Sequence, residues 1–121
     1  MKWYRKAAEQ GDAGAQNNLG LMYGDGPGVV QDYKEAVKWY SKSAEQGYAD
    51  AQFSLGYMYD KGQGVIQYNV YAHIWFNIAA SSGDALAAKN RGIVAKRMTA
   101  ADISKAQELA RACVRKKYND C

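Results

Sequence analysis

Several residue types that build catalytic and metal sites are scarce in this sequence. Its 121 residues include one histidine, two cysteines, one proline and two phenylalanines. A single histidine with cysteines far off at positions 113 and 121 does not supply the clustered ligands of a zinc site. No Ser/His/Asp order, Cys/His pair or carboxylate pair stands out as a catalytic site. We therefore expect no enzyme activity, no metal or cofactor, and no small-molecule substrate.

Long apolar segments are also absent. No run approaches the roughly 18 residues that cross a bilayer, and the first ten residues lack the apolar stretch of a signal peptide. Hydrophobic residues nevertheless make up 48% of the chain, and charged residues 23%. The chain is expected to fold as one soluble domain with a modest core, not as a transmembrane protein.

Positive charge is concentrated near the C-terminus. Residues 89–121 hold nine Lys and Arg against three Asp and Glu, whereas residues 1–88 hold seven against nine. A solvated helix face is the preferred interpretation, because no nucleic-acid motif accompanies the charge. The alternative is a surface for nucleic acid or an anionic membrane. The residues that would carry it are Lys89, Arg91, Lys96, Arg97, Arg115, Lys116 and Lys117.

A repeat of 36 residues organises the chain. The segment AQNNLGLMY at 15–23 returns as AQFSLGYMY at 51–59, and GPGVVQ at 26–31 returns as GQGVIQ at 62–67. An internal period of this length indicates stacked supersecondary units. We expect a single domain over 1–121, with a partial repeat at 1–14, full repeats at 15–50 and 51–86, and terminal helices with a cap at 87–121. The chain would thus begin inside the second helix of a repeat.

Each period predicts two helices joined by a glycine-containing loop. The apolar residues of the first helix recur with helical spacing; they are Ala15, Leu19, Met22 and Tyr23. A capping box beginning at Asp32 starts the second helix, and Gly47 ends it. Its predicted buried residues are Ala36, Trp39, Tyr40 and Ala44. In the next repeat Tyr68 replaces the capping Asp32, and we expect Asn69 to take over; Thr99 is the expected cap of the last helix.

The glycines and the histidine have structural interpretations. Gly20 recurs as Gly56 and Gly92 inside the first helix, where glycine costs about 1 kcal/mol relative to alanine, which predicts a close approach by a neighbouring helix. The motifs at 26–28 and 62–64 lie between helices, so we interpret them as turns and not as phosphate-binding loops. His73 falls inside a second helix beside Ile74 and Trp75, and a packing role is predicted.

The pattern A-Q-x-x-L-G-x-M-Y-x-x-G-x-G-V followed by K-x-A-V-K-W-Y-x-K-x-A-E-Q-G resembles the Sel-one-like repeat of bacterial proteins, a relative of the tetratricopeptide repeat. The resemblance implies an all-α fold: a right-handed α-solenoid of antiparallel helix pairs with a C-terminal capping helix. Similar proteins are adaptors, in which the first helix of each pair lines a groove for a protein or peptide. The groove positions implied here are Asn17, Leu21, Asp25, Phe53, Tyr57, Asp60, Lys61, Lys89, Ile93, Lys96 and Arg97. The alternative for Leu21 and Tyr57 is packing between neighbouring helices.

The two cysteines leave two possibilities open. On a continuous helix Cys113 and Cys121 would lie about 12 Å apart, too far for a disulfide; a helix ending near Lys117, with a turn at 118–120, would bring them together. Cysteine-rich relatives carry the same C-x7-C spacing as a bridge between consecutive helices. The resemblance therefore favours a disulfide over two free thiols, and a disulfide would imply an oxidising compartment such as a bacterial periplasm or the exterior.

The leading hypothesis is thus a protein-binding adaptor with a partner of unknown identity. The basic C-terminal segment is the alternative site, and a regulatory repeat region cut from a longer protein is a third hypothesis. A missing first helix would also leave Trp3, Tyr4 and Ala7 uncovered, which predicts a homodimer through the N-terminal end.

Overall fold

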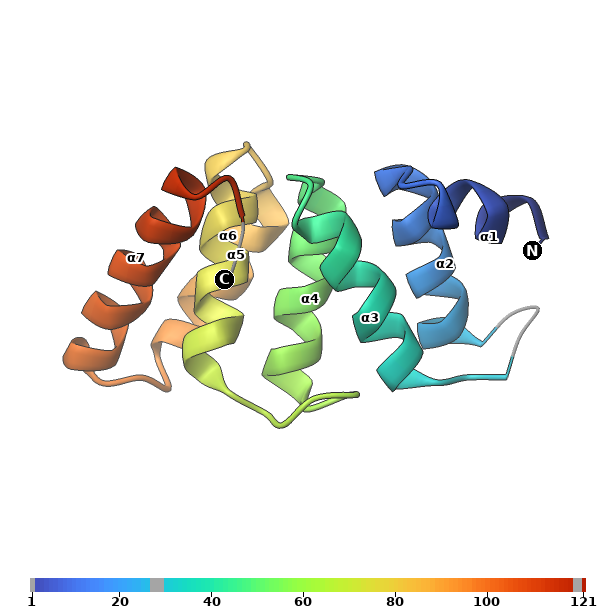
Figure 1. Ribbon diagram of the computed structural model, residues 1–121. Coiled ribbons are helices and arrows are strands. Elements are labelled where there is room, and N and C mark those ends of the chain that lie inside the picture. The colour runs from blue at the N-terminus through green and yellow to red at the C-terminus, as the bar shows by residue number, and fades with distance from the viewer. Residues whose placement is uncertain (1, 27–29, 119–120) are drawn as a thin grey trace.

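The computed structural model describes residues 2–26, 30–118 and 121, which form helices and no β-strand. The helices stand side by side in an elongated row (Figure 1). Their bounds are α1 Lys2–Glu9, α2 Ala13–Asp25, α3 Tyr33–Ala44, α4 Ala49–Lys61, α5 Asn69–Ser81, α6 Ala85–Ala95 and α7 Ala100–Arg115. Each helix from α1 to α5 packs against the next, and α5 contacts both α6 and α7. This order is the predicted α-solenoid, with α7 as the terminal helix. No helix within the described ranges is long and apolar enough to cross a membrane.

The core consists of clusters at the junctions between helix pairs, as expected for stacked repeats. Leu19 and Trp39 centre the first cluster, Tyr40 and Leu55 belong to the largest one, and Phe76 belongs to the third. The second-helix stripe predicted to be buried is confirmed: it consists of Ala36, Trp39, Tyr40 and Ala44, all at most 5% exposed. His73 is also buried, in agreement with its predicted packing role.

Two of the three recurring glycines allow a close helix approach. A Cβ atom on Gly20 would lie 2.7 Å from the ring of Tyr40, and one on Gly56 would lie 2.9 Å from the ring of Phe76. The prediction is confirmed at these positions. It is wrong for Gly92, where nothing lies within 4 Å of an added Cβ. α7 packs mainly against α5 and not against α6, so no ring from a following second helix covers Gly92.

Helix caps follow the sequence at most positions. Asp32 accepts hydrogen bonds from the backbone N–H groups of Lys34 and Glu35, and Thr99 accepts one from Asp102. The expectation that Asn69 caps α5 is wrong, because Tyr68 holds the cap position without a side-chain hydrogen bond and Asn69 is the first helical residue. The Asn69 amide oxygen instead accepts a hydrogen bond from Gln67, at 2.7 Å.

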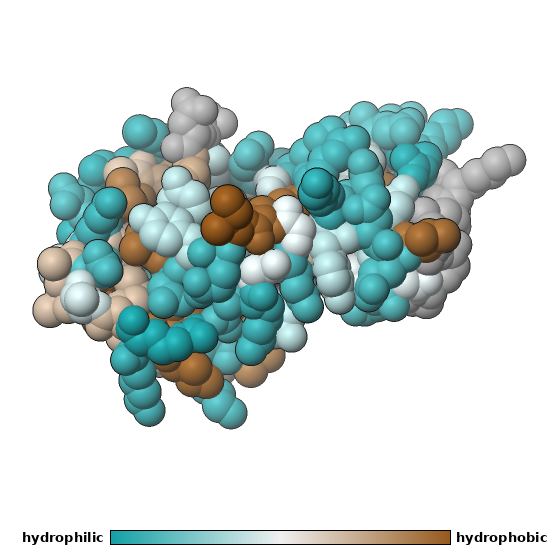
Figure 2. All heavy atoms as spheres, turned by 90° about the horizontal axis from the view of Figure 1, so that it is seen from below, coloured by the Kyte–Doolittle hydropathy of each residue, from teal (hydrophilic) through white to brown (hydrophobic). Residues whose placement is uncertain are grey.

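The loops between the helices of a pair lie along the lower edge in Figure 1. Gly62 and Gly64 both have positive φ angles, as the predicted turn requires; of the equivalent loop, residues 27–29 lie outside the described residues. Val30 and Ile66 occupy equivalent loop positions and are 88% and 90% exposed. Seen from this edge, the surface is largely hydrophilic with small, scattered hydrophobic spots (Figure 2). Isolated exposed apolar residues of this kind do not indicate an interface.

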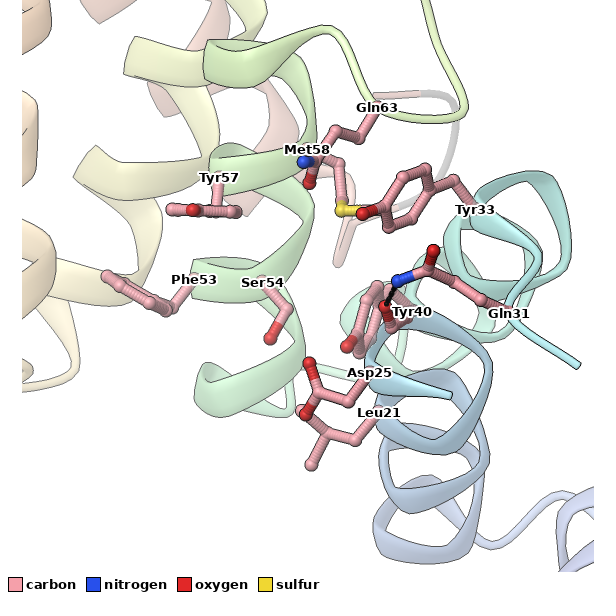
Figure 3. A pocket seen from close by; sticks show the side chains of 11 residues that line it. Leu21, Asp25, Gln31, Tyr33, Tyr40, Phe53, Ser54, Tyr57, Met58 and Gln63 are labelled. Carbon is pink, nitrogen blue, oxygen red and sulfur yellow. Dashed lines mark hydrogen bonds between the residues drawn. The ribbon is translucent and has the colours of Figure 1, made fainter. Parts of the chain in front are cut away.

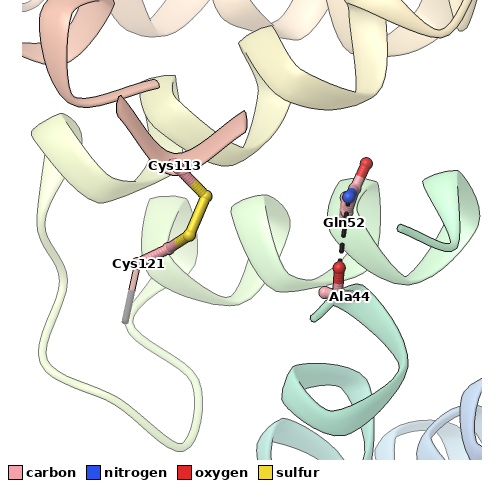
Figure 4. The surroundings of a disulfide bond; sticks show 4 residues. All are labelled: Ala44, Gln52, Cys113 and Cys121. Atoms are coloured by element: carbon pink, nitrogen blue, oxygen red, sulfur yellow. Dashed lines mark hydrogen bonds between the residues drawn. A yellow bond between two sulfur atoms is a disulfide. The ribbon is translucent and has the colours of Figure 1, made fainter. Parts of the chain in front are cut away.

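Two buried glutamines, which the sequence analysis did not single out, tie consecutive pairs together. The Nε2 of Gln52 donates to the carbonyl oxygen of Ala44 at 3.2 Å (Figure 4). Gln16, one repeat earlier, donates to the carbonyl oxygen of Ala8 at 3.0 Å. Each amide thus pairs a carbonyl at the C-terminal end of the preceding helix, where intrahelical donors run out. This hydrogen bond fixes the position of the first helix of each pair relative to the C-terminal end of the helix before it.

The C-terminal segment folds back through a disulfide. Cys113 and Cys121 are bonded, with Cα atoms 5.3 Å apart (Figure 4). α7 ends at Arg115, and Lys117 and Tyr118 adopt positive φ angles of 54° and 68°. Of the predicted turn at 118–120, residues 119 and 120 lie outside the described residues. Tyr118 packs on the large central cluster and against Gly47, so this segment reaches back to the turn between α3 and α4.

The N-terminal end of the row exposes aromatic side chains. Trp3 is 75% exposed and Tyr4 40%, while Ala8 on the same helix is buried against α2. The homodimer expected through this end stays a prediction.

Candidate functional site

A pocket of about 440 Å³ opens between the C-terminal half of α2, the helix α3 and the helix α4. Figure 3 shows its side chains converging from these three elements. Its lining residues are Leu21, Gly24, Asp25, Gln31, Tyr33, Tyr40, Phe53, Ser54, Tyr57, Met58 and Gln63. A pocket of this size, with aromatic walls and about as much polar as apolar surface, suits one or two side chains of a protein ligand.

Helix periodicity pairs residues on each of the two first helices that line the pocket. Leu21 and Asp25 lie four residues apart on α2, and Phe53 and Tyr57 lie four apart on α4. Residues at this spacing share one helix face. Leu21 and Tyr57 are equivalent in the repeat, so Leu21 points from α2 toward α4, whereas Phe53 and Tyr57 project from the side of α4 that is away from α2 and border the pocket at its edge (Figure 3).

The helical glycines set the positions of the aromatic walls. Without a side chain at Gly20, the ring of Tyr40 lies directly against α2 and reaches the pocket. Phe76 lies against Gly56 in the same way, and its ring contacts that of Phe53 with a centroid separation of 5.5 Å. Phe53 is therefore held by the core behind it. Tyr57 and Leu21 are free of such support, at 41% and 39% exposed.

Polar groups gather at the centre of the pocket. The carboxylate of Asp25, the hydroxyl of Tyr40 and the hydroxyl of Ser54 point into the same space between α2 and α4 (Figure 3). Burial, together with the negative charge of Asp25, raises the pKa of Tyr40 to about 12. The phenol therefore keeps its proton at physiological pH and can donate a hydrogen bond. Gln31 donates its Nε2 to the carbonyl oxygen of Gly24 at 2.8 Å, which closes the rim.

The structure brings four of the expected groove residues together in this pocket: Leu21, Asp25, Phe53 and Tyr57. Three others form an adjacent charged cluster. Arg97 donates a hydrogen bond to Asp60, and Lys61 lies 4.0 Å from Asp60 and 5.7 Å from the centre of the Tyr57 ring. This cluster links α4 to the end of α6.

The remaining expected groove residues lie elsewhere. Lys89, Ile93 and Lys96 are exposed along α6 and at its end, outside the pocket. Asn17 is only 5% exposed, contrary to its expected place on an accessible surface. It lies one turn before Leu21, where α2 is covered by its neighbours, so its side chain offers a partner little area.

The other residues that line the pocket are not among the expected groove positions. Tyr33 and Tyr40 come from α3, and Gln31 and Gln63 come from the loops. Ser54 and Met58 each follow an expected groove residue of α4 by one position. A sequence pattern does indicate Tyr40. It follows the helical glycine Gly20 by 20 residues, and the aromatic Phe76 follows Gly56 at the same spacing.

The basic residues do not form one surface. Lys96 and Arg97 lie just before α7. Arg115, Lys116 and Lys117 lie at the C-terminal end of α7, about 22 Å away along the helix. Arg91 donates a hydrogen bond to Asn77 at 2.7 Å, and Arg97 is paired with Asp60. This distribution offers no continuous track for a phosphate backbone. Among the described residues there is also no cluster of His, Cys, Asp or Glu that could hold a metal ion.

Comparisons with known proteins identify the repeat. The family described as Sel1 repeat matches residues 1–12, 13–48 and 49–84, and these boundaries coincide with the starts of α2 and α4. A protective antigen present in uropathogenic Escherichia coli strains, which displays an SLR fold, superposes with a TM-score of 0.91 at 36% sequence identity. That match covers 97% of this chain and 26% of the antigen, so this chain spans about a quarter of the antigen's length.

A Sel1 repeat protein from Oxalobacter formigenes superposes with a TM-score of 0.73 at 41% identity, over 75% of this chain and 68% of that protein. No curated protein sequence matches the chain significantly.

Proposed function

Since the chain belongs to the Sel1 repeat family, whose members are generally protein–protein interaction scaffolds, we propose that it binds a segment of a partner protein on the face formed by α2 and α4. The pocket between α2, α3 and α4 is the anchor site in this proposal. The fold is typically a non-catalytic scaffold, and the described residues contain no constellation that argues otherwise.

The observation that carries the proposal is the pairing of a pocket with exposed apolar residues at its edge. Leu21 and Tyr57 are each about two-fifths exposed, and both line the pocket. Partner binding would bury them, and aromatic residues next to pockets dominate the binding free energy of protein interfaces. Phe53, held against Phe76, provides a rigid wall that costs little entropy on binding.

The structure also determines which substitutions test the site. Replacing Phe53 would disturb Phe76, which is fully buried, so a loss of binding would be ambiguous. Leu21→Ala and Tyr57→Ala remove exposed surface without opening the core. Leu109→Ala is the matched control, because Leu109 is also 39% exposed but lies on α7.

The test is a selection of random linear peptides on the immobilised chain, followed by affinity measurements with the synthetic peptides that are retained. The double variant Leu21→Ala/Tyr57→Ala should bind these peptides about tenfold or more weakly, since truncating a hot-spot residue costs more than about 1 kcal/mol. Leu109→Ala should bind as the unmodified chain does. Equal affinities for all three proteins would show that this face is not the binding site.

A further inference from the structure

The charged side chain that lines the pocket is negative. Among the described residues of the lining, Asp25 is the only Asp, Glu, Lys, Arg or His. The other polar groups there are hydroxyls and amides, which can accept or donate hydrogen bonds. An anionic ligand group would thus meet a carboxylate with no cation in the pocket to offset the repulsion.

Backbone groups add to the negative potential. Asp25 is the last residue of α2, and Gly24 precedes it. Met58 lies in the last turn of α4, and Gln63 follows that helix. The pocket therefore lies at the C-terminal ends of two helices, where the helix dipole favours a positive charge by about 0.3–1 kcal/mol each. The N-terminus of α3, which has the opposite sign, is already capped by Asp32.

The nearby cations are already paired with a different carboxylate. Lys61 and Arg97 both interact with Asp60, whose side chain is only 10% exposed. Neither of them lines the pocket, and neither is paired with Asp25. Lys61 also lies over the ring of Tyr57, 5.7 Å from its centre.

We infer that the pocket binds a lysine or arginine side chain presented by the partner protein, with its charged group at Asp25 and its methylene stem against Leu21 and the aromatic walls. Long cationic side chains bury their stems on apolar surface while the charged head keeps polar contacts. Tyrosine faces attract such a head directly. An apolar side chain would fill the same space but would leave the carboxylate of Asp25 desolvated without a compensating charge. The inference rests on the proposed function, because it names what the anchor site recognises.

The test uses short capped peptides of the form Ala-Ala-X-Ala-Ala and follows the backbone amide signals of the chain by NMR. The matched pair is X = arginine and X = citrulline, which have nearly the same shape and differ in charge; X = glutamate is the third member. Arginine should shift the signals of residues 21–25 and 53–58. Citrulline should bind about 1.5- to fivefold more weakly, the range expected for a solvent-accessible ion pair. Glutamate should produce no shift in these residues.

Substitution of the carboxylate separates charge from shape. Asp25→Asn should reduce the preference for the arginine peptide over the citrulline peptide, leaving only the part due to the helix ends and the aromatic rings, and should leave the citrulline affinity unchanged. Glu108→Gln, an exposed acidic residue on α7, should keep the full preference for arginine.

Equal binding of arginine and citrulline, or a preference for arginine that is undiminished in Asp25→Asn, would overturn the inference, and so would the absence of shifts with all three peptides. The proposed function fails separately. The proposed function is refuted if the selected peptides bind the Leu21→Ala/Tyr57→Ala variant as tightly as the unmodified chain. It is supported, without the further inference, if their binding depends on this face but requires no cationic residue.

Discussion

The three helical glycines allow the steric effect of close helix packing to be compared at equivalent positions of one chain. Gly20, Gly56 and Gly92 occupy equivalent positions in α2, α4 and α6. Replacing any of them by alanine gains about 1 kcal/mol of helix propensity. The steric consequences differ, because an added Cβ would meet the ring of Tyr40 at 2.7 Å, the ring of Phe76 at 2.9 Å, and nothing within 4 Å, respectively.

The magnitudes decide the sign of each effect. At Gly92 only the propensity gain acts, so Gly92→Ala should stabilise the chain by about 0.5–1 kcal/mol. At Gly56 the new methyl group must displace Phe76, which is fully buried and packed against Phe53. Overpacking of this kind costs about 1–3 kcal/mol, which cancels or exceeds the propensity gain. Gly20→Ala should behave as Gly56→Ala does.

Urea unfolding followed by circular dichroism measures the effect on the three variants and the unmodified chain. Because all three substitutions are chemically identical, the difference between Gly56→Ala and Gly92→Ala isolates the steric cost, which should be about 1–3 kcal/mol. In thermal unfolding each kcal/mol corresponds to roughly 3–6 °C for a domain of this size. If Gly20→Ala and Gly56→Ala were as stable as Gly92→Ala, the close approach of the rings would not determine the spacing of the helices.

Two further predictions concern the disulfide and the buried histidine. The bond between Cys113 and Cys121 closes a short loop, with a sequence separation of 8, so Cys113→Ser/Cys121→Ser should lose about 2.5 kcal/mol of stability by loop entropy. Reductant should lower the urea midpoint of the unmodified chain to that of the double variant and leave the variant itself unchanged; two titratable thiols in the denatured, unreduced chain would contradict this. Burial, aided by the charge of Arg91, lowers the pKa of His73 below its ordinary value of 6.5, so the unfolded chain takes up a proton first as the pH falls below about 6.5. Stability should therefore decrease with falling pH in this window, and His73→Gln should lack that component; parallel pH curves of urea midpoints for the two proteins would refute it.

Most of the fold follows from local sequence patterns. The repeat of 36 residues, the apolar stripes and the caps at Asp32 and Thr99 each depend on residues within a few turns of helix, and such patterns dictate where a helix starts and which face it buries. The prediction that Asn69 caps α5 is wrong because α5 starts at the position that is equivalent to the start of α3 in the preceding repeat. Tyr68 therefore stands at the cap position. A position in a repeat can thus outweigh the preference of one side chain.

The candidate site was only half predictable. The resemblance to the tetratricopeptide repeat implied Leu21, Asp25, Phe53 and Tyr57 as groove positions, and these four line the pocket. The wall contributed by Tyr33 and Tyr40 depends on how closely α3 approaches α2 and α4. That distance results from the packing of many side chains against Gly20 and within the core, and a pattern on one helix does not contain it.

By itself the sequence determined the repeat and the helix pairs, since these are periodic properties of neighbouring residues. Only the tertiary structure decided that Asn17 is covered, that Asp60 is neutralised by Arg97 from another repeat, and that Gly92 faces open space. It also joined Cys113 to Cys121 where the spacing had left two possibilities. Each of these depends on the register and separation of helices that are distant in sequence, and those are fixed by close packing across the whole stack.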